Sequence, residues 1–169
     1  GPVVATSVGP GVWGADCCAW GRGLGCDEAG HSDAGCAIDH LVTVHPGAVQ
    51  AVELAKVAKL GLTTWLAGQA LLKGETTSEV ARLADGLHVV PEFLGNRAPF
   101  ADPDAKGLIA GLDMDQSIDS LIKLYVAGVG GLGYGLRQII ETQAAHAVSI
   151  SSVVVSGGEG KDARVRQLL

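Results

Sequence analysis

The segment Gly128–Gly133 reads GVGGLG, the G-x-G-x-x-G spacing typical of dinucleotide-binding turns. In such a turn, glycines between a strand and a helix let the backbone approach a pyrophosphate. A strand over Leu121–Ala127, a helix over Tyr134–Ala145 and Glu159 as the ribose-binding acid would complete an NAD-type site. However, apolar residues at helical spacing continue through the glycines, which favours one long helix. Both interpretations stay open on these residues alone.

A second glycine turn follows the β-branched run Ser149–Val155, at Gly157 and Gly158, with Lys161 close behind. Glycines let a ligand approach the backbone, and the amides that begin a helix favour a phosphate or nucleotide. An ordinary strand-to-helix turn would use the same residues.

The block Glu28–Gly35 reads EAGHSDAG and combines an acid, an imidazole and a hydroxyl. Glu28 could accept hydrogen bonds from sugar hydroxyls, and Ser32 could cap the helix that follows. Without further information, capping alone is the simpler interpretation.

A polar loop occupies the first half of Pro91–Leu112, which reads PEFLGNRAPFADPDAKGLIAGL. Its polar members are Asn96, Arg97 and Asp102, and its two X-Pro steps favour an extended, stiff chain. Rigid polar loops between apolar segments often present binding groups. A surface connection whose Asp and Asn side chains cap turns is the alternative. We expect the loop to shape the domain beside a cleft, so that Arg97→Ala lowers stability more than nucleotide affinity.

Cysteine and histidine residues gather near the start of the chain: Cys17, Cys18, Cys26, Cys36, His31, His40 and His45. Zinc could use such ligands, but no C-x2-C pair occurs and the spacing matches no common structural zinc site. We therefore expect buried thiols that pack as small apolar side chains, and no metal.

Apolar periodicity and stop signals predict the elements that would position these groups. Helices are expected over 31–45, over 48–73 with breaks possible at Gly61 and Gly68, over 79–85 with Thr77 or Ser78 as the cap, and over 117–145. Strands are expected over 87–90, 107–112 and 149–155. We expect the long helix to pack its glycine-rich face on a sheet that contains residues 87–91 and 149–155.

Composition excludes several classes of protein. The chain has 169 residues, of which 47% are hydrophobic and 18% charged, so it can form one domain with a real core and is not a disordered chain. Its net charge of −6 without a basic cluster argues against nucleic-acid binding. No apolar run is long enough to span a bilayer and no signal peptide is apparent, so a cytoplasmic protein without membrane partners is expected.

Four blocks, in order, resemble the pentulose (ribulose-type) branch of the FGGY carbohydrate kinases: Pro10–Gly14, Glu28–His40, Phe93–Leu112 and Ser156–Gln167. They cover nearly the whole chain. The resemblance implies an α/β domain of the ribonuclease-H-like (actin-like ATPase) fold, with a mixed sheet flanked by helices. Residues 1–169 would form most of the C-terminal, nucleotide-side domain, truncated at its C-terminal end. The N-terminal catalytic domain would be absent.

The resemblance also assigns nucleotide-binding residues. Thr6 and Ser7 stand at the turn that faces the ATP phosphates, where Ala5 replaces the family's glycine. Gly157, Gly158 and Lys161 lie in the segment beneath adenosine, where Glu159-Gly160 and Asp162 depart from the usual small residue and Asn.

On the substrate side, Glu28 stands where the family has an acid that faces the sugar. His31 replaces the usual Gln, and Trp13 belongs to the first block. No block resembles the one that carries the family's catalytic aspartate, so no catalytic residue is expected in this chain.

The implied function is ATP-dependent phosphorylation of a sugar, a pentulose such as ribulose, by the parent enzyme with ATP and Mg²⁺. This chain would supply the adenosine-side half of the cleft and would be inactive alone. Its partners would be the sugar, ATP and the N-terminal kinase domain. The alternatives are a non-catalytic binding or dimerisation module, such as a truncated kinase remnant that forms a homodimer, and an NAD-type dinucleotide binder.

Overall fold

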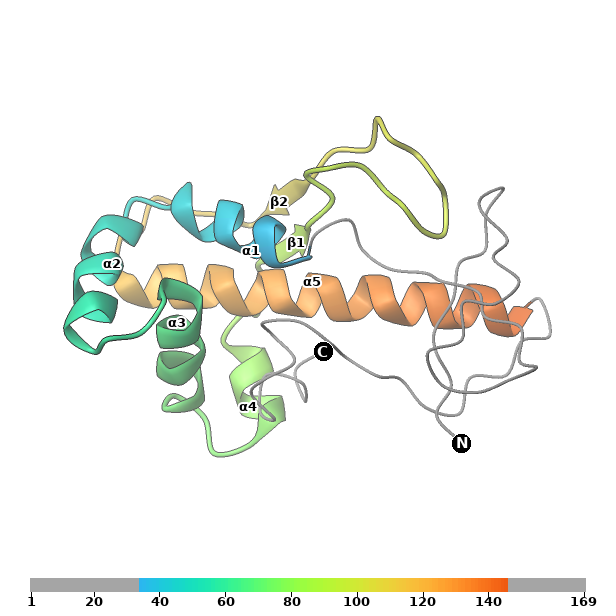
Figure 1. The fold of residues 1–169 in the computed structure, drawn as a ribbon. Coiled ribbons are helices and arrows are strands. Elements are labelled where there is room, and N and C mark those ends of the chain that lie inside the picture. The colour runs from blue at the N-terminus through green and yellow to red at the C-terminus, as the bar shows by residue number, and fades with distance from the viewer. Residues whose placement is uncertain (1–33, 146–169) are drawn as a thin grey trace, which may run out of the picture.

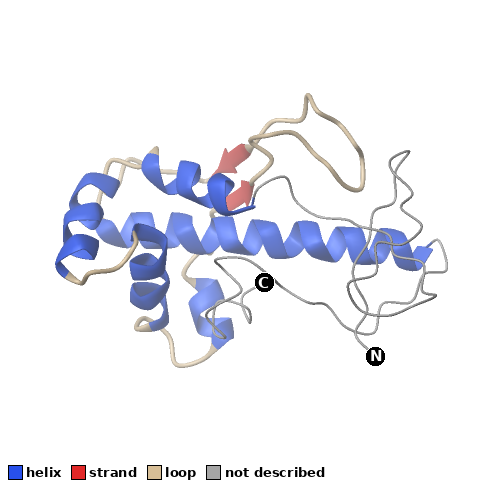
Figure 2. Ribbon diagram, in the orientation of Figure 1, coloured by secondary structure: helices blue, strands red, loops and turns tan. Residues whose placement is uncertain are grey.

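The computed structural model describes residues 34–145, which form a helix-rich α/β arrangement (Figures 1 and 2). The elements in chain order are α1 (Ala34–Thr43), α2 (Ala48–Val57), α3 (Leu62–Leu71), α4 (Thr77–Arg82), β1 (His88–Val90), β2 (Leu108–Ala110) and α5 (Ile118–Ala145). The long α5 is the axis of this arrangement. In Figure 1, α1 and the β1–β2 hairpin lie above it, and α3 and α4 lie below.

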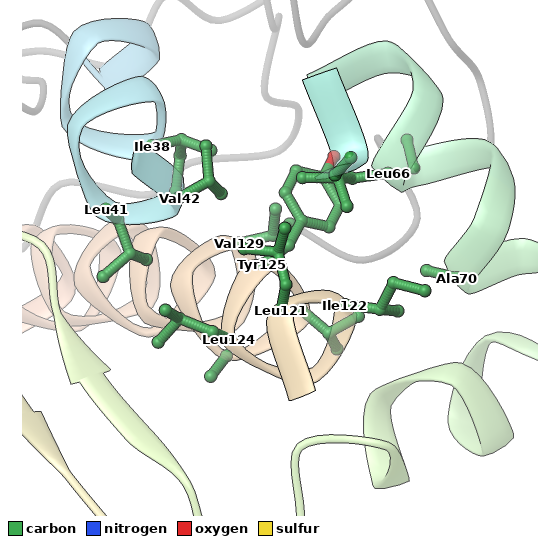
Figure 3. Packing of buried hydrophobic residues seen from close by; sticks show 14 of the residues in the cluster. Ile38, Leu41, Val42, Leu66, Ala70, Leu121, Ile122, Leu124, Tyr125 and Val129 are labelled. Carbon is green, nitrogen blue, oxygen red and sulfur yellow. The ribbon is translucent and has the colours of Figure 1, made fainter. Parts of the chain in front are cut away.

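The hydrophobic core surrounds the N-terminal half of α5. Its fully buried side chains include Leu121, Leu124 and Val129, against which α1 and α3 pack. Figure 3 shows side chains of α5 lying between those of α1, such as Val42, and those of α3, such as Leu66. Each buried side chain of this size contributes about 1.5–3 kcal/mol through the hydrophobic effect, so this cluster is the main source of stability in the described part.

A buried histidine joins the turn after α1 to the start of α5. His45 Nδ1 accepts a hydrogen bond from Gly47 N at 3.0 Å, which leaves the ring proton on Nε2, 3.3 Å from Ser120 Oγ. Ser117 Oγ accepts from Ser120 N at 3.1 Å and so caps the helix. The Asp115 carboxylate accepts hydrogen bonds from Ser117 N and from Ser117 Oγ. These bonds, chiefly the one from Ser117 N, hold the pKa of the carboxyl below its ordinary value.

The described strands form one antiparallel pair, with Val89 opposite Ile109 and Val90 opposite Leu108. Val89 is buried against α5, whereas Val90 and Leu108 are exposed on the other face of the hairpin. The backbone of β1 approaches α5 so closely that a Cβ built on Gly131 would overlap the Val89 carbonyl oxygen. This confirms that the glycine-rich face of the long helix packs on the strand near residues 87–91. The expected strand at 149–155 lies outside the described residues, so the mixed sheet stays a prediction.

The G-x-G-x-x-G segment is helical, which confirms the long helix expected over 117–145 and contradicts the alternative of a strand over 121–127 with a nucleotide-binding turn after it. The segment forms a continuous helix because its apolar residues make core contacts along one face of α5. A turn at the glycines would not place these residues on one face. The glycines have packing reasons instead. A Cβ on Gly128 would overlap Leu41 of α1, and Gly131 meets β1.

The cap predicted for the short helix is wrong, because the N-cap of α4 is Thr76 and not Thr77 or Ser78. Thr76 Oγ1 accepts from Glu79 N at 3.2 Å, while the Glu79 carboxylate accepts from Thr76 N at 3.0 Å. This reciprocal pair needs a hydroxyl three residues before the acid, which only Thr76 provides. The hydrogen bonds from Thr76 N and Glu75 N hold the pKa of Glu79 below its ordinary value.

The break expected within the segment 48–73 is confirmed at Gly61, which lies between α2 and α3, whereas Gly68 lies inside α3. Cys36 is exposed, so the expectation of a buried thiol is wrong there. Among residues 34–145, no helix has the length and apolarity needed to cross a membrane.

Two neighbouring glycines of α5 allow a direct test of the close approach. Gly131→Ala should destabilise the protein by about 2 kcal/mol, because the new methyl group overlaps the β1 backbone. Gly130→Ala is the matched control. Among the described residues its methyl group would meet nothing within 4 Å, and Ala is the better helix former by about 1 kcal/mol. Urea unfolding measured for both variants should shift in opposite directions, and equal shifts would contradict this packing.

Candidate functional site

The loop between the two strands, residues 91–107, is called the hairpin loop below. Its centre is Asn96, a polar residue only 6% exposed. The side chain of Asn96 donates from Nδ2 to the Glu92 carboxylate and accepts from Phe100 N at 3.0 Å. The backbone of Asn96 donates to Asp102 O at 2.7 Å. One side chain therefore joins both arms of the loop, which fixes its shape without regular secondary structure.

The base of the hairpin loop is closed by tight packing. Gly95 has a φ of 85°, and a Cβ there would lie 2.8 Å from Pro103 O. Both facts require glycine. The Phe93 ring lies directly over Gly107, and its centroid is 5.1 Å from that of the His40 ring in an edge-to-face contact. This contact attaches the hairpin loop to α1.

The other polar members predicted for the loop take different positions. Asp102 is exposed and caps a turn, since its Oδ1 accepts from Asp104 N at 2.9 Å. Arg97 is also exposed. The hairpin loop is therefore held together at the buried Asn96, whereas the side chains of Arg97 and Asp102 are exposed on its surface.

A cavity of about 570 Å³ lies between the end of α4, β1 and the second half of α5. Its floor is the glycine face of α5, including Gly130, Gly131 and Gly135. At its charged end, Arg137 Nε donates to Glu141 Oε1 at 2.7 Å, and this hydrogen bond raises the pKa of Arg137. The cavity thus combines the glycine-rich backbone of a helix with an ion pair.

The predicted site residues all lie outside the described part of the chain. Those expected on the nucleotide side are Thr6, Ser7, Gly157, Gly158 and Lys161, and those expected on the sugar side are Trp13, Glu28 and His31. Their roles stay predictions. In sequence the described elements adjoin these segments, because α1 begins three residues after His31, inside the Glu28 block, and α5 ends four residues before Ser149.

Sequence reasoning missed Glu92 and the cavity. The signal for Glu92 was its position four residues before Asn96, but only the folded loop brings an acid and an amide at that spacing together. The glycines that form the floor of the cavity were expected to pack on a sheet, but nothing in the sequence indicated the cavity beside them. Within residues 34–145, no group of three or more His, Cys, Asp and Glu side chains could hold a metal ion.

Asn96→Ala should destabilise the chain by about 1–3 kcal/mol, because Phe100 N and the Glu92 carboxylate lose their partner in a buried position. Lys106→Ala is the control within the same loop, and its exposed position predicts a change within about 0.5 kcal/mol. Thermal unfolding of the two variants measures the difference. Equal stability of Asn96→Ala and the wild type would show that the loop does not depend on this side chain.

Comparison with known proteins places this arrangement in a family. The family model described as "FGGY family of carbohydrate kinases, C-terminal domain" matches residues 3–169. An FGGY carbohydrate kinase domain-containing protein of Xenopus laevis is 37% identical over 153 residues, which cover 90% of this chain and 28% of that protein. A D-ribulokinase of Saccharomyces cerevisiae is 31% identical over 161 residues, which cover 94% of this chain and 22% of the yeast protein.

Among solved structures, the xylulose kinase from Bifidobacterium adolescentis aligns with a TM-score of 0.46 and 22% identity, over 69% of this chain and 21% of that chain. The chain spans about a quarter of the length of the curated relatives named above. Because the family model covers nearly every residue, the chain belongs to the FGGY family of carbohydrate kinases and matches its C-terminal domain.

Proposed function

We propose that this chain is the nucleotide-side domain of an ATP-dependent sugar kinase whose substrate is a pentulose such as ribulose. The observation that carries the proposal is the continuous family match over residues 3–169. The D-ribulokinase among the relatives supports a pentulose substrate. We further propose an actin-like ATPase fold for the whole domain, with ATP and Mg²⁺ bound in a cleft shared with a preceding domain.

The described elements support this proposal through the segments that they hold. The block with Glu28 and His31 leads into α1, which is packed against α5 where Gly128 meets Leu41. The far end of α5 leads toward Gly157 and Gly158. Both segments are therefore continuous in sequence with helices of one packed core. Phosphoryl transfer depends mainly on positioning and charge neutralisation, so a rigid support of this kind suits the chemistry.

An NAD-type site is not proposed, because its fingerprint lies inside α5. The proposed adenosine segment is instead Gly157 and Gly158, with Lys161, and the proposed phosphate turn is Thr6 and Ser7. Trp13, Glu28 and His31 are proposed on the sugar side. A preceding N-terminal domain would supply the catalytic base and complete the cleft.

Nucleotide binding tests the first part. The chain should bind ATP with Mg²⁺ weakly, and Gly158→Asp should weaken that binding at least about tenfold, because a carboxylate would obstruct the backbone and repel the phosphates. Isothermal titration calorimetry measures both affinities. Gly61→Asp is the matched control. It adds the same charge at the N-cap of α3, where a Cβ would meet nothing within 4 Å. Unchanged affinity in Gly158→Asp would refute the adenosine assignment.

Turnover tests the second part. The isolated chain should not consume ATP in the presence of ribulose or xylulose, because no block in it resembles the one that carries the family's catalytic aspartate. A coupled assay of ADP release measures this. Sugar-dependent release above the background without protein would show that the chain carries a complete active site.

A further inference from the structure

The β1–β2 hairpin presents apolar side chains that nothing in the described part of the chain covers. Val90 and Leu108 are cross-strand partners on the face away from α5, with exposed fractions of 45% and 53%. On the hairpin loop, Leu94 and Phe100 are 62% and 66% exposed. These four side chains are called the hairpin surface below. All four belong to one hairpin and its loop, and exposed apolar side chains concentrated in one such unit are candidates for an interaction site.

The hairpin surface is held rigidly in place. Phe100 follows the buried Asn96 by four residues, and its backbone N–H is bonded to the Asn96 side chain at 3.0 Å. Leu94 precedes Gly95, whose backbone is packed against Pro103. Figure 1 shows the loop projecting from the body of the protein, away from α5. A rigid loop with an aromatic side chain at its surface loses little conformational entropy when a partner binds, so it is suited to serve as an anchor.

The comparisons indicate the occupant. The matched region is a C-terminal domain and makes up 28% and 22% of the length of two relatives, so in those proteins most of the polypeptide precedes or flanks this domain. We propose that the hairpin surface docks against the apolar surface of the domain that precedes this one in the parent kinase, a proposal that rests on the proposed function. The docking would fix the two walls of the cleft relative to each other at a point attached to α1 through Phe93 and His40.

The test uses the full 169-residue chain and, as the probe, the part of the Xenopus laevis relative that precedes its matched region. The probe is purified separately, and circular dichroism checks that it is folded. One variant combines Leu94→Ser with Phe100→Ser. The matched control combines Val49→Ser with Val57→Ser on α2, where both side chains are also exposed, at 78% and 83%.

We expect the wild type and the control to bind the probe equally in calorimetry, and the Leu94/Phe100 variant to bind at least about tenfold more weakly. Its melting temperature should stay within about 2 °C of the wild type, since these side chains are exposed. Equal binding by all three proteins would overturn the proposal, as would the absence of any binding by the wild type.

Two further outcomes would assign the surface to another occupant and so also overturn the proposal. A clearly lower melting temperature for the Leu94/Phe100 variant would show that other residues of the same chain cover the surface. A dimer in light scattering that this variant abolishes would show that a second copy covers it. ATP binding by the same preparations is measured in parallel. If docking fails while ATP binds, only the docking proposal fails, whereas loss of ATP binding in the wild type contradicts the proposed function.

Discussion

The close approach of three elements at the glycines of α5 is the constraint on which the rest of the structure depends. At Gly128 the helix meets Leu41 of α1, and at Gly131 it meets the backbone of β1. A helix interior normally disfavours glycine by about 1 kcal/mol relative to Ala. The contacts on either side offset this cost, because they let a helix and a strand pack closer to α5 than any side chain would permit. The position of α1, and of everything attached to it, follows from these contacts.

The hairpin loop depends on the same contacts. β1 carries the loop, and β1 is placed by Gly131. The Phe93 ring then meets both Gly107 and His40, so the base of the loop is fixed to the strand and to α1 at once. The hydrogen bonds of Asn96 stabilise the loop only because this base is closed. In a loop with an open base, water would compete for the same hydrogen bonds. The glycines of α5 therefore determine the position of β1, and β1 determines the position of the hairpin loop.

Helices and strands within residues 34–145 could be predicted from periodicity, because their apolar spacing and stop signals are local properties. Contacts that form only when the chain has folded could not be predicted. The packing of the α5 glycines on the strand near residues 87–91 was predicted, but the contact of Gly128 with Leu41 of α1 is seen only in the folded structure. Likewise, Asn96 was recognised as a polar member of the loop, but its bond to Glu92 arises only after the loop folds. The residues predicted to touch ATP and sugar came from resemblance, and they lie outside the described residues.

The continuity of α5 through its glycines has a consequence for function. Ala145 lies twenty residues beyond Tyr125, so at 1.5 Å per residue the end of the helix is about 30 Å from the centre of the core. A turn at the glycines would have left the end at Ala145 free to move relative to the core. An unbroken helix instead carries the position set by the core around Leu121 and Val129 as far as Ala145. The same core positions α1, which begins at Ala34. The spacing of Ala34 and Ala145, the two ends of the described part, is therefore determined by packing against a single helix.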